Sequence, residues 1–337
     1  MEKEERGDAM DSLIFAVNAI MPIVLMVALG YFLKRIGWMN GGFAAMTNKL
    51  VFRVFLPAML FLNIYKIEDI TTVEPGYIVY TVVVLLLLFL AALPAVMLTT
   101  KTSARRGALW QAVFRSNYAL VGIPLAQSLF GDPGVAVASL LSAIVVPLLN
   151  VLAVISLTVF GTSGERPSVK RVLLGIAKNP LIQAVALGLV VQAVRAGFQN
   201  WGVEFRISDI KPIYKLLEDL SKLATPLALL CLGAQFEFSV VSALRREIVF
   251  GTLMRTLVVP VLGIGTAFLF LRNSFGGAQF ASFVAVFATP VSISSVPMSQ
   301  EMGGDTALAG QLVVWSTLVS TVSIFLTAFL LRAAGVF

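Results

Sequence analysis

Few residue types in this sequence could perform covalent chemistry. The 337-residue chain contains no His and one Cys, Cys231. It therefore lacks the side chains for a His–Glu zinc motif, a Ser–His pair, a histidine proton relay, a disulfide or a thiolate cluster. No Gly-rich phosphate loop followed by Lys-Ser or Lys-Thr occurs either. We expect no catalytic residue, no metal site and no cofactor, and predict that the protein is not an enzyme.

The polar residues that could bind a ligand lie near prolines in two apolar stretches, 108–130 and 279–300. Proline inside a helix removes a backbone donor and clashes with the preceding turn, and within a membrane the freed groups need protein or water as partners. A simple proline kink and serines that merely pack between helices are the alternatives. We predict that both helices break at a substrate site. Its candidate residues are Asn117, Arg115, Gly122, Pro124, Pro290, Ser292, Ser294, Ser295 and Pro297.

The ionisable residues well inside the apolar stretches are all basic, namely Arg53, Arg115, Lys222 and Arg255. Such residues are costly in a membrane and are candidates for function. Arg115 lies at the entry to the first predicted break, which favours an anionic ligand. Arg53 and Lys222 are candidate accessory cations, although Lys222 could pair with Glu218 one turn earlier. For Arg255 we expect the long side chain to extend toward the membrane interface.

The elements that position these residues must be membrane-spanning helices. Charged residues make up 13% of the chain and hydrophobic residues 58%, with a mean hydropathy of +0.92, whereas soluble domains carry about 25% charged residues. Several uncharged stretches reach the roughly 20 residues needed to cross a bilayer. The sequence therefore predicts an all-α polytopic membrane protein. The net charge of +7 does not indicate a nucleic-acid partner, because the cations are scattered in short loops.

We predict ten spans after a polar N-terminal tail, residues 1–11. They cover residues 12–34, 45–65, 76–99, 108–130, 134–161, 172–194, 219–236, 247–271, 279–300 and 306–332. The distribution of Lys and Arg among the short loops places both termini on the non-cytoplasmic side of the plasma (inner) membrane. The basic segment around 195–215 is interpreted as interfacial.

Three ordered matches within the chain indicate an internal repeat. They pair residues 22–30 with 180–188, 53–57 with 222–226, and 124–132 with 297–305. Each repeat would contain five spans, with residues 12–161 as the first, 162–171 as a short cytoplasmic connection and 172–332 as the second. An odd number of spans inverts the second copy, a recurrent design in secondary transporters.

Four stretches resemble the auxin efflux carrier family, including bacterial members similar to malonate- or malate-type carriers. They are NKLVFRVFLPAMLF (48–61), FRSNYALVGIPLAQSLFG (114–131), LATPLALLCLG (223–233) and ATPVSISSVPMSQEMGGDTALAGQLVVWSTLVS (288–320).

This resemblance implies two inverted five-helix repeats with broken, crossing helices 4 and 9, an architecture shared with bile-acid symporters. It further implies a mobile transport domain and a scaffold domain, interleaved across both repeats, that work by an elevator mechanism. Asn117 matches the crossover asparagine that faces the substrate, and Pro124 and Pro297 match the crossover prolines. The long hydrophilic loop of the plant carriers is absent, so auxin is not the expected substrate.

The expected function is a secondary membrane transporter that exports a small organic anion, a carboxylate, by alternating access. Without an intramembrane Asp or Glu to carry a coupling ion, we expect electrogenic export driven by the membrane potential. A sodium- or proton-coupled organic-anion symporter is the alternative. The expected partners are the anion and the lipid bilayer, with no nucleic acid, and a homodimer is an open question.

Overall fold

The computed structural model describes residues 21–66, 75–161, 169–200 and 206–337 as an all-helical protein. The predicted tail 1–11, the first part of span 12–34 and most of the connection 162–171 lie outside these residues. Within the described part, six helical stretches are long and apolar enough to cross a membrane: Gly41–Tyr65, Pro75–Thr99, Tyr118–Val159, Pro180–Phe198, Arg245–Leu271 and Thr306–Ala333. The predicted all-α polytopic class agrees with these helices.

A helix over residues 21–35 comes first. The elements that follow are α2 (Gly41–Leu50), η1 (Val51–Phe55), α3 (Leu56–Tyr65), α4 (Pro75–Thr99), α5 (Ser103–Phe114), η2 (Tyr118–Gly122), α6 (Ile123–Val159), α7 (Val169–Lys178), α8 (Pro180–Asn200), η3 (Ile207–Asp209), α9 (Lys211–Gln235), η4 (Phe238–Val240), α10 (Arg245–Leu253), η5 (Met254–Val258), η6 (Val261–Gly265), α11 (Thr266–Leu271), α12 (Gly277–Phe287), α13 (Ser295–Glu301) and α14 (Thr306–Ala333).

Wider, π-type helical turns accommodate several of the prolines. The turn η1 ends two residues before Pro57, η2 two residues before Pro124, and η5 two residues before Pro260. A proline clashes with the carbonyl four residues back, and a widened turn moves that carbonyl away. The helices at Pro57 and Pro260 therefore continue through the proline.

Two predicted boundaries differ from the structure. Helix α9 begins at Lys211, well before the expected residue 219, because Pro212 starts the helix and Lys215 Nζ bonds Asp219 Oδ1 (2.8 Å) one turn on. Part of the segment interpreted as interfacial is thus helical. The predicted span 172–194 consists of α7 and α8, which separate at Asn179, whose side-chain oxygen accepts from the backbone N of Leu181 (2.9 Å).

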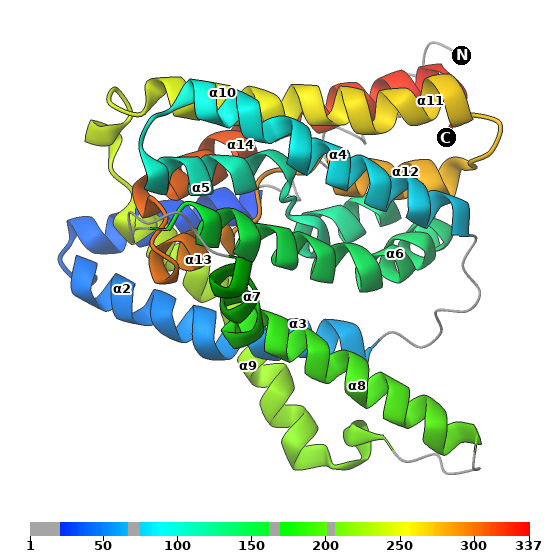
Figure 1. Cartoon of the computed structure of the whole chain (residues 1–337), viewed down its shortest axis with the longest axis horizontal. Coiled ribbons are helices and arrows are strands. Elements are labelled where there is room, and N and C mark those ends of the chain that lie inside the picture. Colours follow the sequence, from blue (N-terminus) through cyan, green and yellow to red (C-terminus); the bar gives the residue numbers. More distant parts are fainter. Residues whose placement is uncertain (1–20, 67–74, 162–168, 201–205) are drawn as a thin grey trace.

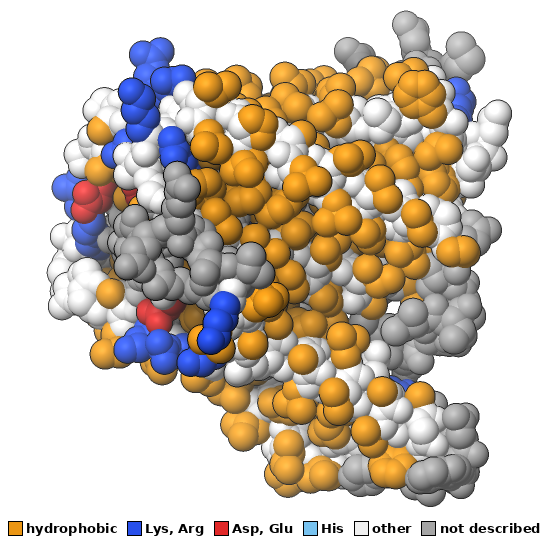
Figure 2. All heavy atoms as spheres, viewed as in Figure 1, with side chains coloured by type: hydrophobic (Ala, Val, Ile, Leu, Met, Phe, Trp, Pro, Cys, Tyr) orange, Lys and Arg blue, Asp and Glu red, His pale blue; other side chains and the backbone are white. Residues whose placement is uncertain are grey.

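The helices form two groups in Figure 1, where α2, α3, α8 and α9 lie along the lower side and α4, α5, α10, α11, α12 and α14 along the upper side. Figure 2 shows a broad apolar band across the middle of the molecule, and most of the visible Lys and Arg side chains gather at the end where α10 begins. This distribution is typical of a protein whose apolar band faces lipid.

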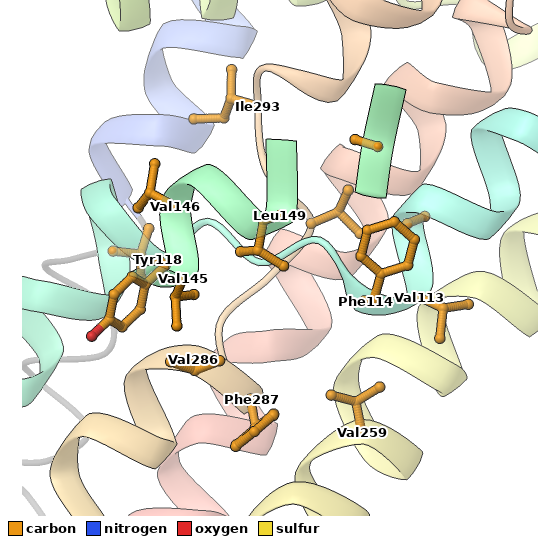
Figure 3. Close-up of a cluster of buried hydrophobic side chains, with 14 of the residues drawn as sticks. Val113, Phe114, Tyr118, Val145, Val146, Leu149, Val259, Val286, Phe287 and Ile293 are labelled. Atoms are coloured by element: carbon orange, nitrogen blue, oxygen red, sulfur yellow. The ribbon is translucent and has the colours of Figure 1, made fainter. Parts of the chain in front are cut away.

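Long helix α6 has an irregular point that separates two parts. Phe130 and Gly131 are not helical, and Gly131 has a φ of 60°. The sequence placed a boundary between spans here, at residues 130–134. The part of α6 before this point follows the first candidate break, and the part after it supplies Val145, Val146 and Leu149 to the apolar cluster in Figure 3.

Candidate functional site

Two helices are interrupted within the stretches where the sequence predicted breaks, although the first interruption lies ahead of Gly122 and Pro124, through which the helix continues. Helix α5 ends at Phe114, and the chain is helical again from Tyr118, so residues 115–117 form the first interruption. Helix α12 ends at Phe287 and α13 begins at Ser295, which leaves residues 288–294 as the second interruption. Figure 3 shows the two connecting segments passing each other, with buried apolar side chains of α5, η2, α6 and α12 around them.

The two interruptions satisfy each other's backbone groups. The backbone N of Asn117 donates to Pro290 O (2.8 Å), and the backbone N of Ser292 donates to Arg115 O (3.1 Å). Ser116 and Val291 form an antiparallel bridge between these bonds. Because lipid offers no partners for free peptide groups, this pairing allows two extended segments to persist inside the apolar band.

A cavity of about 50 Å³ lies beside the interruptions. Four of the predicted residues line it, namely Arg115, Asn117, Ser292 and Ser294. Other walls come from α3, the second part of α6, α8 and α9, which contribute Asn63, Asn150, Leu181 and Thr225 among others. A space of this size, in which polar side chains stand among mostly apolar ones, accommodates a few water molecules or a small ligand.

Arg115 supplies a positive charge to this cavity. Its side chain is 2% exposed. Its Nη2 donates to Asn150 Oδ1 and to Ser294 Oγ, both at 2.8 Å, and its Nη1 to Gln111 Oε1 at 3.3 Å. Across the described parts of the chain, no Asp or Glu pairs with it. Because a buried charge is costly without a counter-charge, the site favours an anion.

Asn117 adds a donor with no partner. The residue is 3% exposed, and its Nδ2 has no hydrogen-bond partner among the residues that the structure describes. The hydroxyl of neighbouring Ser116, which also lines the cavity, is in the same situation. Buried polar atoms are almost always paired, so these atoms indicate a place where a ligand or water completes the hydrogen bonding.

The remaining predicted site residues do not line the cavity. Pro290 accepts the bond from Asn117, while Pro297 is buried in α13 and Ser295 is buried with an unpaired hydroxyl. Pro124 is exposed at the start of α6. Gly122 allows close packing, because an added Cβ would lie 2.7 Å from Ala285 O of α12. These residues lie in or next to the interruptions, whereas the side chains of Arg115, Asn117, Ser292 and Ser294 line the cavity.

The two candidate accessory cations lie elsewhere. The exposed Arg53 pairs with Glu301 (Nε to Oε2, 3.2 Å). Lys222 is exposed as well, and neither residue lines the cavity. The suggested partner of Lys222, Glu218, instead pairs with Lys66 at 3.4 Å.

Our expectation for Arg255 is wrong. The side chain does not extend to the interface but is fully buried, at 0% exposed. It donates to the carbonyl oxygens of Thr289 (2.8 Å), Val286 (2.7 Å), Val113 (3.3 Å) and Phe114 (3.4 Å). Carbonyls at the helix ends beside the two interruptions accept from this guanidinium, so the side chain stays inside the bundle.

Three polar residues of this region were not predicted. Asn150 and Gln111 hold the Arg115 guanidinium, and Asn63 lines the cavity. Each is an amide within an apolar stretch, a type of residue that usually faces the interior of a membrane bundle. That signal could have identified Asn150, which follows Pro147 in an otherwise uncharged span.

A comparison with protein families identifies the class of this protein. The profile described as membrane transport protein matches residues 15–328. The chain belongs to this family of membrane transporters. Membership confirms the resemblance to auxin efflux carrier-type proteins. A relative described as an uncharacterized transporter, from Methanothermobacter thermautotrophicus, is 23% identical over 315 residues, which cover 92% of this chain and 96% of the relative. The family and the relative are transporters rather than enzymes, so the cavity is a candidate transport site.

Proposed function

We propose that this transporter is a secondary carrier that exports a small organic anion, a carboxylate, by alternating access. The observation that carries the proposal is the buried Arg115 guanidinium, which faces the cavity without an acidic partner in the described residues. A carboxylate accepts paired hydrogen bonds from one guanidinium group, and such charge-assisted bonds are among the strongest in proteins.

The neighbouring side chains suit a carboxylate as well. The Nδ2 of Asn117 offers an unused donor, and the hydroxyls of Ser292 and Ser294 lie 2.9 Å apart at the same cavity. The present partners of Arg115 Nη2 are the neutral side chains Asn150 and Ser294, whereas an anionic ligand would offer the guanidinium a charged acceptor.

The proposed architecture has ten spans in two inverted five-helix repeats. Two glycines in the matching segments 22–30 and 180–188 support it. A Cβ on Gly30 would collide with Leu230 O in α9, and a Cβ on Gly188 would lie 2.9 Å from Ile64 Cβ in α3. In the repeat, α9 is the counterpart of the α2–α3 helix. The first span thus packs closely on α9, and its counterpart α8 packs closely on α3. These two contacts are equivalent in the repeat, as an inverted repeat requires.

The proposed scaffold domain consists of the helix 21–35 with α2, α3, α8 and α9, and the other helices form the transport domain. Two small apolar clusters have all their buried members in the scaffold group or the loop within it: Met39, Ala44, Cys231 and Ala234 in one, and Phe61, Leu62, Tyr65 and Ala184 in the other. The main apolar cluster joins residues of both groups. The cavity lies where the groups meet. A second cavity, of about 390 Å³, also lies between them, and its lining includes Gln235 of α9 and Gln300 of α13, which are hydrogen-bonded to each other (Nε2 to Oε1, 3.2 Å). Both cavities lie along α9, and together they suggest a route for the substrate between the scaffold and transport groups of helices.

The proposed driving force is the membrane potential. Of the described residues, neither Asp nor Glu lines the first cavity, so no carboxyl group there can carry a coupling proton. The second cavity is lined by Glu237, which pairs with Lys34 at 3.6 Å. An inside-negative potential of 100 mV drives a monoanion outward with about 2.3 kcal/mol, enough for a gradient of roughly fiftyfold. Both termini are proposed to lie on the non-cytoplasmic side.

Efflux from proteoliposomes tests this function. Vesicles loaded in turn with labelled acetate, malonate, malate and indole-3-acetate would be given an inside-negative potassium diffusion potential. We expect the potential to accelerate efflux of at least one small carboxylate, with little effect of sodium or a pH gradient. Dependence on sodium or protons without a response to voltage would contradict the proposal and favour the symporter alternative.

A further inference from the structure

The buried Arg255 occupies a group of backbone carbonyls at the ends of two helices. Its four acceptors, the oxygens of Val113, Phe114, Val286 and Thr289, are here called the carbonyl cage. Two are the last residues of α5, one is the penultimate residue of α12, and one lies just beyond α12. All four come from the main chain, so their positions are set by the helix ends.

The interruptions explain why these carbonyls are free. In a continuous helix, Val286 O would accept from the backbone N of residue 290, but that residue is Pro290, which has no N–H. Val113 O would accept from the backbone N of Asn117, which instead donates to Pro290 O. Arg255 Nη2 and Nη1 take the places of these missing donors, at 2.7 and 3.3 Å respectively.

The cage also supplies negative charge. Each helix C-terminus carries about half an elementary negative charge, so the ends of α5 and α12 together provide roughly one. Within the described chain, Arg255 pairs with no Asp or Glu. The two helix ends are therefore the counter-charge of the guanidinium. The side chain reaches them from η5, the widened turn before Pro260.

We propose that the carbonyl cage is a cation site that the protein fills permanently with its own Arg255 guanidinium. In carriers with discontinuous helices, unwound carbonyls and half-helix C-termini are where coupling cations such as Na⁺ bind. Here that position is occupied by a tethered cation, which holds the two interruptions together. A consequence, which rests on the proposed function, is that the transport cycle needs no free cation at this place.

Chemical rescue of a truncated side chain tests the site without any transported substrate. Arg255→Ala removes the tethered cation, and the melting temperature of the purified protein should fall by at least about 5 °C, since four buried acceptors lose their donors. Methylguanidinium at about twenty times its Kd should restore a few degrees. Neutral methylurea, which has a similar shape, should not restore the melting temperature.

Arg246→Ala is the matched control, because Arg246 in the same helical stretch donates to one carbonyl, Leu98 O (2.9 Å), and is exposed.

Equal stabilisation by methylguanidinium and methylurea, or equal rescue of Arg246→Ala, would overturn the proposal. If Arg255→Ala does not fold, Arg255→Lys and Arg255→Met decide the matter. The variant Arg255→Lys retains a positive charge with three donors, so it should keep most of the thermal stability of the wild-type protein. The variant Arg255→Met fills a similar space without a charge, so it should lose that stability. Equal melting temperatures for these two variants would show that the cage needs no cation. Absence of transport for every carboxylate would leave these stability results unchanged and would count only against the proposed function.

Discussion

The cavity and the carbonyl cage each hold a buried arginine, but the two arginines have different partners. Arg255 donates to four backbone carbonyls, which cannot move without disturbing the helix ends. Arg115 donates to the side chains of Gln111, Asn150 and Ser294, whose rearrangement would disturb the backbone less than a movement of the helix ends would. A buried charge held by side chains can exchange its partners for a ligand, whereas one held by the main chain stabilises structure. Arg115 is thus expected to affect transport and Arg255 to affect stability.

The largest effect is expected for Arg115→Gln. Removing one member of a buried, hydrogen-bonded charge pair costs roughly 2–5 kcal/mol. The kcat/KM for the transported carboxylate should therefore fall by a factor of between about thirty and more than a thousand. The melting temperature should change far less than in Arg255→Ala, because the lost partners are side chains that can bind water. Efflux assays and thermal unfolding measured on the same preparations check both parts.

Arg115→Lys serves as the control for charge. It keeps a cation but loses the planar, paired donors, so its transport should lie between wild type and Arg115→Gln. Unchanged transport by Arg115→Gln would show that the Arg115 guanidinium does not bind the substrate. The two arginines would then not differ in function.

The next largest effect is expected for Asn117→Ala. The Nδ2 of Asn117 has no partner in the described structure, so its removal leaves folding intact but takes one donor from the ligand. A hydrogen bond to a charged group contributes roughly 1.5–3 kcal/mol, so affinity should fall about ten- to a hundredfold. Substrate-dependent thermal shifts measure this change directly. A variant with wild-type affinity would place the ligand away from the first interruption.

A smaller effect, on stability alone, is expected for Gly122→Ala. The added Cβ would lie 2.7 Å from Ala285 O and 2.9 Å from a ring carbon of Tyr118, and this overpacking should cost about 1–3 kcal/mol. Gly197→Ala in helix α8 is the matched control, since a Cβ there meets nothing within 4 Å. Equal melting temperatures of the two variants would show that α12 and η2 can separate freely.

The position of the second interruption follows from local sequence, because Pro290 lies within it and has no N–H to donate. The first interruption lies ahead of Pro124, through which the helix continues. Arg115 and Asn117 belong to the first interruption itself, so their presence at the cavity could be predicted once a break was expected in this stretch. The widened turns before Pro57 and Pro260 show that proline by itself is insufficient, because those helices continue.

Long-range packing determines what the sequence could not predict. Asn150 and Asn63 reach the cavity from distant helices, and only the tertiary structure brings them there. In the sequence, Arg255 does not differ from other basic residues in apolar spans. Its partners, the carbonyls of Val113 and Val286, are recognised only in the tertiary structure. Its role depends on two helix ends far apart in sequence, so no local pattern reveals it.

The smallest effect is expected for Lys222→Gln, which tests how far the positive field of the site extends. Lys222 shares helix α9 with the cavity residues Ala224 and Thr225 but is itself exposed, and it does not line the cavity. Exposed charges contribute about 0–1 kcal/mol at most, so transport should change by less than about fivefold. Arg53→Gln, which breaks an exposed ion pair with Glu301, should behave similarly. A tenfold or larger loss in Lys222→Gln, with an unchanged melting temperature, would mean that the anion passes along the outer face of α9. The guanidinium of Arg115 would then be one of several cations on the route rather than the main one.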